Sequence, residues 1–85
     1  MNNIRITKML KREDVMNDLG ISSQQLQTFR ELGILKPIYL GSGWKYSQQD
    51  LLRFQEEYAG LDVSNPQKAK IAKETVDKRK VELNS

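Results

Sequence analysis

The amino-acid sequence predicts one small, mainly α-helical domain that carries a single β-hairpin. Apolar residues recur every three to four positions in several short segments, which is the spacing of amphipathic helices. Between residues 33 and 47 the spacing changes to every second position, which is typical of strands. A chain of 85 residues, 38% hydrophobic and 29% charged, has the composition of a globular protein but is too short for two independent cores.

The residue inventory argues against enzyme chemistry. The sequence contains no cysteine and no histidine, so it lacks disulfides, thiolate ligands and the most common general base. We therefore expect no catalysis, no metal and no cofactor; the scattered acids Asp14, Asp18 and Glu57 show no spacing that would form a carboxylate metal site. The first residues lack the apolar region of a signal peptide, and no apolar run reaches the length of a membrane span, which predicts a cytoplasmic protein without a membrane partner.

The first predicted helix covers residues 12 to 19. Val15 and the apolar residues that follow it line one helical face, and acidic residues occupy the first turn, where the helix dipole favours them. Gly20 ends this helix, because glycine adopts the left-handed conformation that helix ends commonly require. Lys11 cannot accept a capping hydrogen bond, so the sequence offers no good side-chain cap unless Thr7 acts earlier.

The second predicted helix has the strongest start signal and covers about residues 23 to 32. Ser22 and Gln25 have the spacing of a capping box, in which each side chain accepts a hydrogen bond from the backbone of the other. Apolar residues at helical spacing, Phe29 among them, define a buried face. Gly33 ends the helix.

Residues 37 to 46 predict a small β-hairpin of the kind called a wing. The segment 41–43 forms an uncharged tip of small residues. Tyr39 and Lys45 are expected to point outward. The residues expected on the inner side, where Trp44 would be a core residue, are Ile38, Leu40, Trp44 and Tyr46.

A third helix is predicted to begin after Ser47 and to end near Gly60. Ser47 and Asp50 have the spacing of a second capping box. Arg53 is expected to be a solvated surface charge on this helix. The residues predicted for its inner face are Leu51, Phe54 and Tyr58.

The pair Asn65-Pro66 predicts the start of a last, basic helix. Arg79 falls on its apolar seam and alanines bury little area, so this helix would be marginal alone. We therefore expect a domain over residues 1–60 and a C-terminal helix or tail over residues 61–85. That segment could fold on DNA, bind another protein, or be a solvated helix without a special role. The residues that fit a heptad seam are Ala69, Ala72, Val76 and Leu83.

The order of helix, glycine turn, capped helix, hairpin and helix is that of a winged helix-turn-helix. The characteristic pieces are Leu19-Gly20-Ile21-Ser22, Gly33-Ile34-Leu35-Lys36-Pro37, Trp44-Lys45-Tyr46 and Asp50-Leu51. With these pieces, residues 9–58 resemble the DNA-binding domain of the MerR superfamily, especially its small excisionase-type members. Full-length MerR regulators continue into a dimerisation helix and an effector-binding segment, for which 85 residues leave no room, so we expect no small-molecule effector.

The second helix carries the side chains expected to contact bases. Each glutamine taken singly is explained as well by a helix surface, but residues 20 to 29 contain no charge in a chain that is 29% charged. Amide and hydroxyl groups match the donors and acceptors of base edges. The predicted base-contacting residues are Ser23, Gln24, Gln27 and Thr28.

Contacts to DNA phosphates are predicted mainly from basic side chains around this helix. Any one lysine is explained as well by a solvated surface charge. The resemblance to the MerR superfamily implies a phosphate contact for Arg30, and Tyr39 would either touch the DNA backbone or only shield the sheet. The predicted backbone-contacting residues are Lys11, Arg12, Arg30, Lys36, Tyr39, Ser42 and Lys45.

Together these features predict a non-enzymatic, sequence-specific protein that binds double-stranded DNA. The resemblance implies either an excisionase-like recombination directionality factor, whose partner is an integrase or recombinase, or a small transcription regulator that meets RNA polymerase. A single module buries only about 600 to 1,000 Å² on DNA, so we also expect cooperative self-association on DNA. The alternative is a protein-interaction adaptor or antirepressor that reuses the winged fold and docks through its C-terminal helix.

Overall fold

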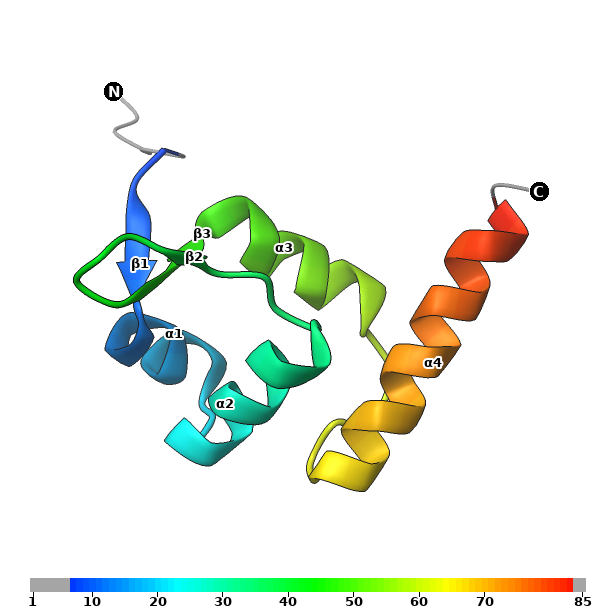
Figure 1. Ribbon diagram of the computed structural model, residues 1–85. Helices are drawn as coiled ribbons and strands as arrows, with labels where there is room; N and C mark the ends of the chain where they lie inside the picture. The colour runs from blue at the N-terminus through cyan, green and yellow to red at the C-terminus, as the bar shows by residue number, and fades with distance from the viewer. Residues whose placement is uncertain (1–6, 84–85) are drawn as a thin grey trace.

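The computed structural model describes residues 7–83 and shows a mainly helical chain with a small antiparallel sheet (Figure 1). Within that range the elements are β1 (Met9–Lys11), α1 (Arg12–Leu19), α2 (Ser23–Leu32), β2 (Ile38–Tyr39), β3 (Trp44–Ser47), α3 (Gln48–Glu57) and α4 (Pro66–Leu83). The first three predicted helices are confirmed, with α1 and α2 covering the predicted residues, and the C-terminal segment predicted as a helix or tail is a helix. None of the helices described is long and apolar enough to cross a bilayer.

Local hydrogen bonds set both ends of α2, as predicted. The Ser22 hydroxyl accepts from the Gln25 backbone N–H at 3.1 Å, and the Gln25 side-chain oxygen accepts from the Ser22 N–H at 3.0 Å. At the other end Gly33 has a φ of +77°, which only glycine adopts easily. The Ile34 N–H then donates to the Phe29 carbonyl at 2.8 Å and satisfies one of the last carbonyls of the helix.

Strand β1 was not predicted from the sequence. It pairs with β3 so that Leu10 lies opposite Tyr46 and Lys11 opposite Lys45. Lys11 is also the residue before α1, and its N–H donates to the Asp14 carboxylate at 3.3 Å. The start of α1 therefore depends on the sheet and on a bond from the first helical turn. A three-residue strand has no local signature when its partner is distant in the sequence.

Strand β3 lies in the middle of the sheet, and its pairing with β2 corrects the predicted side-chain directions. Ile38 lies opposite Lys45, and Tyr39 lies opposite Trp44. Opposite residues share a face, so Tyr39 is on the side of Trp44 and Tyr46, and Ile38 is on the side of Lys45. The predicted grouping was wrong because a shift of one residue in register moves every side chain to the other face.

Trp44 is not a core residue, which corrects a second prediction for the hairpin. It is 41% exposed, and Ile38 and Leu40 are 54% and 55% exposed, whereas Tyr46 is buried. Strand β2 has only two residues, and the hairpin extends beyond the helices (Figure 1). Tyr46, further from the tip, is the residue of β3 that reaches the core.

Helix α3 begins as predicted, because the Ser47 hydroxyl accepts from the Asp50 N–H at 2.9 Å. It ends at Glu57, a few residues before the predicted end near Gly60. Its predicted inner face is confirmed. The side chains that form this face are Leu51 and Tyr58, which are buried, and Phe54, which packs against the core.

The core lies where the helices meet the sheet. Val15 of α1 and Phe29 of α2 are almost fully buried, as are Ile34 and Leu35 just after α2. The Phe54 ring of α3 joins this group, with its centroid 5.4 Å from that of Phe29. The segment after α2 is therefore held between α2 and α3.

Helix α4 packs on the side of α2 that lies away from the hairpin (Figure 1). Three of the four predicted seam residues are buried, and the fourth, Leu83, is 85% exposed. Gly33 shows how closely the helices approach, because a Cβ added there would lie 3.5 Å from the Lys73 side chain. The seam residues that join the common core are Ala69, Ala72 and Val76.

Replacing Ser22 by alanine should lower the free energy of unfolding by about 1 kcal/mol, because the Gln25 N–H loses its acceptor. Ser23 is a matched control, since it is exposed and lies one position inside the helix. Ser23→Ala should change stability by less than about 0.5 kcal/mol. Urea denaturation followed by circular dichroism measures both, and equal losses would contradict the role of the cap.

Candidate nucleic-acid interface

The exposed face of α2 brings together most of the side chains predicted to contact bases. Ser23, Gln24 and Gln27 are exposed on it, and Thr28 is half-buried at its border. The Gln27 amide nitrogen donates to the Glu31 carboxylate at 3.0 Å, so the amide oxygen of Gln27 points away from that carboxylate. Glu31 was not predicted as part of this face, although its position four residues after Gln27 was a visible signal.

Thr28 lies on the side of α2 that faces α4. Its hydroxyl donates to the Gln24 carbonyl at 3.1 Å, one turn earlier. Together with Gln24 and Gln27, it lines a groove of about 660 Å³ between the exposed face of α2 and the segment 63–66 that leads into α4. A duplex that reached Thr28 would therefore also meet the start of α4, which the sequence had not placed near this face.

On the opposite side of α2, Arg30 contacts the hairpin. Its guanidinium carbon lies 4.9 Å from the centroid of the Trp44 ring. The Tyr39 ring meets the same indole edge-on, with centroids 5.3 Å apart. Burial raises the pKa of Tyr46, and the positive charges of Arg30 and Arg12 act in the opposite direction. The structure thus groups two predicted phosphate contacts with the aromatic residues of the hairpin.

The hairpin carries further predicted backbone contacts. Lys11 and Lys45 lie opposite each other in neighbouring strands and therefore share one face of the sheet. At the tip the Lys45 ammonium donates to the Ser42 hydroxyl at 3.4 Å. The Tyr39 hydroxyl donates to the Gly41 carbonyl at 3.5 Å. Lys11 and Lys45 therefore make one face of the sheet positive, and Tyr39 lies on the opposite face.

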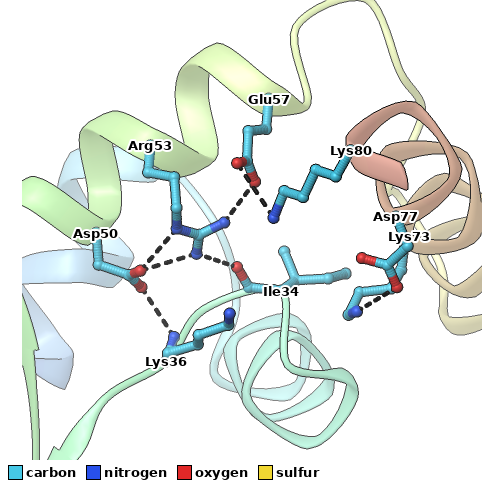
Figure 2. A network of polar contacts seen from close by, with 8 residues as sticks. All are labelled: Ile34, Lys36, Asp50, Arg53, Glu57, Lys73, Asp77 and Lys80. Atoms are coloured by element: carbon cyan, nitrogen blue, oxygen red, sulfur yellow. Dashed lines mark hydrogen bonds and ion pairs between the residues drawn. The ribbon is translucent and has the colours of Figure 1, made fainter. Parts of the chain in front are cut away.

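Arg53 is the centre of a polar network, which corrects its prediction as a solvated surface charge (Figure 2). It donates from Nη2 to the Ile34 carbonyl at 2.6 Å, from Nε to the Asp50 carboxylate at 2.9 Å, and from Nη1 to the Glu57 carboxylate at 2.7 Å. Its side chain is 26% exposed. The helical spacing of the two acids was visible in the sequence, but the Ile34 contact depends on how the segment after α2 crosses α3.

The Arg53 network also holds the segment that leads into the hairpin. The Lys36 N–H donates to the Asp50 carboxylate at 2.8 Å, so this carboxylate binds the chain before β2 instead of completing the predicted box with Ser47. In α4 the pKa of Asp77 is lowered mainly by a hydrogen bond from Lys73, and to a smaller extent by the charges of Lys80 and Lys36. The backbone of Lys36, a predicted phosphate contact, is thus attached to α3.

Glu57 extends the same network to α4. The Lys80 ammonium lies 3.2 Å from the Glu57 carboxylate (Figure 2). Burial would raise the pKa of Glu57, but hydrogen bonds from Arg53 and Lys80 outweigh it and hold the pKa below its ordinary value. The end of α2, the start of the hairpin, α3 and α4 are therefore joined through neighbouring polar contacts.

Comparison with protein-family models, with curated proteins and with solved structures gives no match. The resemblance of residues 9–58 to the MerR superfamily therefore stays a prediction from the sequence. The arrangement of side chains at the site carries the functional argument.

Replacing Arg53 by methionine should lower the free energy of unfolding by about 2 to 3 kcal/mol. The physical reason is that the Ile34 carbonyl and the Asp50 carboxylate lose their donor while partly shielded from water. Arg79 is the matched control, because it is an exposed arginine of α4. Arg79→Met should cost less than about 0.5 kcal/mol. A loss in Arg53→Met no larger than in the control, measured by urea denaturation, would show that the network does not stabilise the fold.

The lowered pKa of Glu57 predicts a specific sensitivity to acid. An unfolded glutamate has a pKa of about 4.3, so at low pH the unfolded chain takes up this proton before the folded chain does. The stabilisation is fully present above that pH and is lost as the pH falls through the lower pKa of the folded state. Glu57→Gln should therefore be less stable at neutral pH and lose less stability in acid.

Glu56, an exposed neighbour in the same helix, provides the control for this experiment. Glu56→Gln should keep the full acid-dependent loss of the unchanged chain. The measurement is the denaturant midpoint between about pH 7 and 3. If the curve for Glu57→Gln ran parallel to that of the unchanged chain, the assignment to Glu57 would be wrong.

Proposed function

We propose that the chain is a sequence-specific protein that binds double-stranded DNA, of the winged helix-turn-helix class. In this proposal α1 and α2 form the helix-turn-helix, α2 lies in the major groove, and the β2–β3 hairpin is the wing on the backbone or in an adjacent minor groove. The observation that carries the proposal is the exposed face of α2, whose amide and hydroxyl groups share the helix with Arg30, the arginine that contacts the hairpin. The proposal involves binding and no catalytic step.

The orientation of Gln27 suggests which bases this face would recognise. Its amide nitrogen donates one of its two N–H groups to Glu31 at 3.0 Å, and its amide oxygen stays available to accept hydrogen bonds. In the major groove the donors are the exocyclic amino groups of adenine and cytosine. Ser23 and Gln24 add polar groups to the same exposed face. We therefore propose an adenine or a cytosine opposite Gln27.

Positive charge next to α2 and on the sheet supports contacts with the phosphate backbone. Arg30 contacts Trp44, and Lys11 and Lys45 lie together on the opposite face of the sheet from Trp44. Phosphate contacts set the orientation of a protein on the duplex but carry no direct sequence information. The proposal assigns orientation to these cations and base selection to α2.

Two biological roles fit this proposal. One is an excisionase-like recombination directionality factor that acts with an integrase or recombinase, and the other is a small transcription regulator that acts with RNA polymerase. A module of this size buries only about 600 to 1,000 Å² on DNA, which limits the specificity of a single copy. We therefore propose that copies bind neighbouring sites cooperatively in either role.

The apolar surface of the hairpin favours a second candidate function. Ile38 and Leu40 are each more than half exposed, and contacts to phosphates do not require such side chains. A protein-interaction adaptor or antirepressor would use them, together with α4, to bind another protein. In that case DNA binding would be weak and independent of sequence.

Selection of binding sites from a random duplex library, with the whole chain near physiological salt, tests the proposal. We expect a short motif that is repeated or inverted at the spacing of one helical turn, about 10 base pairs. The motif should contain A or C in the strand that faces Gln27. Recovery of no sequence above background would contradict sequence recognition and favour the adaptor.

Two substitutions separate base contacts from phosphate contacts. Gln27→Ala should relax the preference at one base pair by about 1 to 3 kcal/mol. Gln55, an exposed glutamine of α3, is the matched control, and Gln55→Ala should leave every preference intact. Lys45→Ala should weaken all sequences alike and reduce the salt slope by about one. Unchanged base preference in Gln27→Ala would contradict the placement of α2 in the major groove.

A further inference from the structure

Trp44 and Arg30 form a contact between the hairpin and α2 that the proposed function has not yet used. The guanidinium carbon lies 4.9 Å from the centroid of the indole ring, within the range of a cation–π interaction. The Tyr39 ring packs against the same indole from the other strand, with centroids 5.3 Å apart. The indole is thus placed between a tyrosine of β2 and an arginine of α2.

The core does not account for this arrangement. Trp44 is 41% exposed, whereas Tyr46 on the same face of β3 is buried. Among residues 7–83, the ion pairs of the structure do not include Arg30. Arg53, by contrast, forms ion pairs with Asp50 and Glu57. The indole is therefore the main contact that restricts the Arg30 guanidinium.

We propose that Trp44 is a positioning residue that orders the Arg30 guanidinium for a DNA phosphate, an inference that rests on the proposed DNA-binding function. A guanidinium that lies over an aromatic face makes this contact without using its N–H groups as donors, so they can still donate to phosphate oxygens. The stack also reduces the rotational freedom that the long arginine side chain would otherwise lose on binding. In this proposal Trp44 of the hairpin helps Arg30 of α2 to bind a phosphate, and Trp44 does not contact the bases itself.

A phosphate fits this position better than a base. Arg12 is close to the hairpin, because Lys11 before it lies opposite Lys45, the residue after Trp44, and the charge of Arg12 acts on Tyr46 as that of Arg30 does. Two cations beside one aromatic cluster attract an anion, whereas the polar groups suited to bases lie further round α2. Arg30 and Arg12 would therefore hold one edge of the DNA backbone against the hairpin, and Trp44 would keep Arg30 in place.

The first test uses fluorescence of the free chain, since Trp44 is the only tryptophan in the sequence. Arg30→Met keeps a long apolar stem but removes the cation, so it should change the emission of Trp44 without DNA. Arg79→Met, at an exposed position on α4, should leave the emission unchanged. Emission that is identical in Arg30→Met and the unchanged chain would overturn the stack.

The second test is a double-mutant cycle on DNA affinity, with the duplex recovered by site selection. Trp44→Leu should weaken binding by about three- to tenfold, with no change in the salt slope, because no charge is removed. Arg30→Met should weaken binding and reduce the salt slope by about one. The double variant should bind no more weakly than Arg30→Met, because Trp44 acts only through Arg30.

Trp44→Phe is the conservative variant and should recover part of the affinity lost in Trp44→Leu, since phenylalanine retains an aromatic face. Circular dichroism and thermal unfolding check that each variant is folded, which the exposure of Trp44 favours. Additive losses in the double variant would overturn the positioning role, because they would mean that Trp44 acts independently of Arg30. If the unchanged chain selects no duplex, the proposed function and this role both fail, whereas specific binding with additive losses removes only the role of Trp44.

Discussion

The hydrogen bond from the Arg53 guanidinium to the Ile34 carbonyl is the contact on which the arrangement of the interface depends. Ile34 lies where the chain leaves α2, so this 2.6 Å bond attaches the end of α2 to α3. The same guanidinium orients Asp50, whose carboxylate accepts from the Lys36 N–H just before the hairpin. One planar group with several fixed donors thus holds the segment between α2 and the hairpin against α3.

This frame, the contacts of Arg53 and Asp50 with Ile34 and Lys36, explains how α2 and the hairpin can form one continuous surface. Helix α2 and the hairpin are joined by a short segment, and apolar packing of Ile34 and Leu35 buries it while the Arg53 network restrains its backbone. At the far end of the same arrangement, Arg30 meets Trp44 across the gap between helix and hairpin. Helix α4 supports the other flank of α2 and is itself joined to α3 through Lys80 and Glu57. Paired charges hold the frame together, whereas the exposed face of α2 consists mainly of neutral polar side chains.

Helix positions were predictable because their signals are local. The capping box of Ser22 and Gln25 and the left-handed glycine Gly33 act within one turn of the residues that they satisfy. The exposed polar face of α2 was predictable for the same reason, since helical spacing alone separates it from Phe29. Strand β1 was not predictable, because three residues acquire a strand conformation only through pairing with a distant segment. Pairing also decides the register of the hairpin, and with it the exposure of Trp44.

The sequence by itself therefore determined the first three helices, the hairpin and the kind of side chain on the exposed face of α2, since these depend on residues that are neighbours along the chain. Only the tertiary structure decided which segments lie next to the exposed face of α2. It placed Arg30 on Trp44, brought the start of α4 beside Thr28, and made Arg53 a structural centre instead of a surface charge. The physical reason is that each of these contacts joins segments distant in sequence, and their relative positions depend on how the whole core packs.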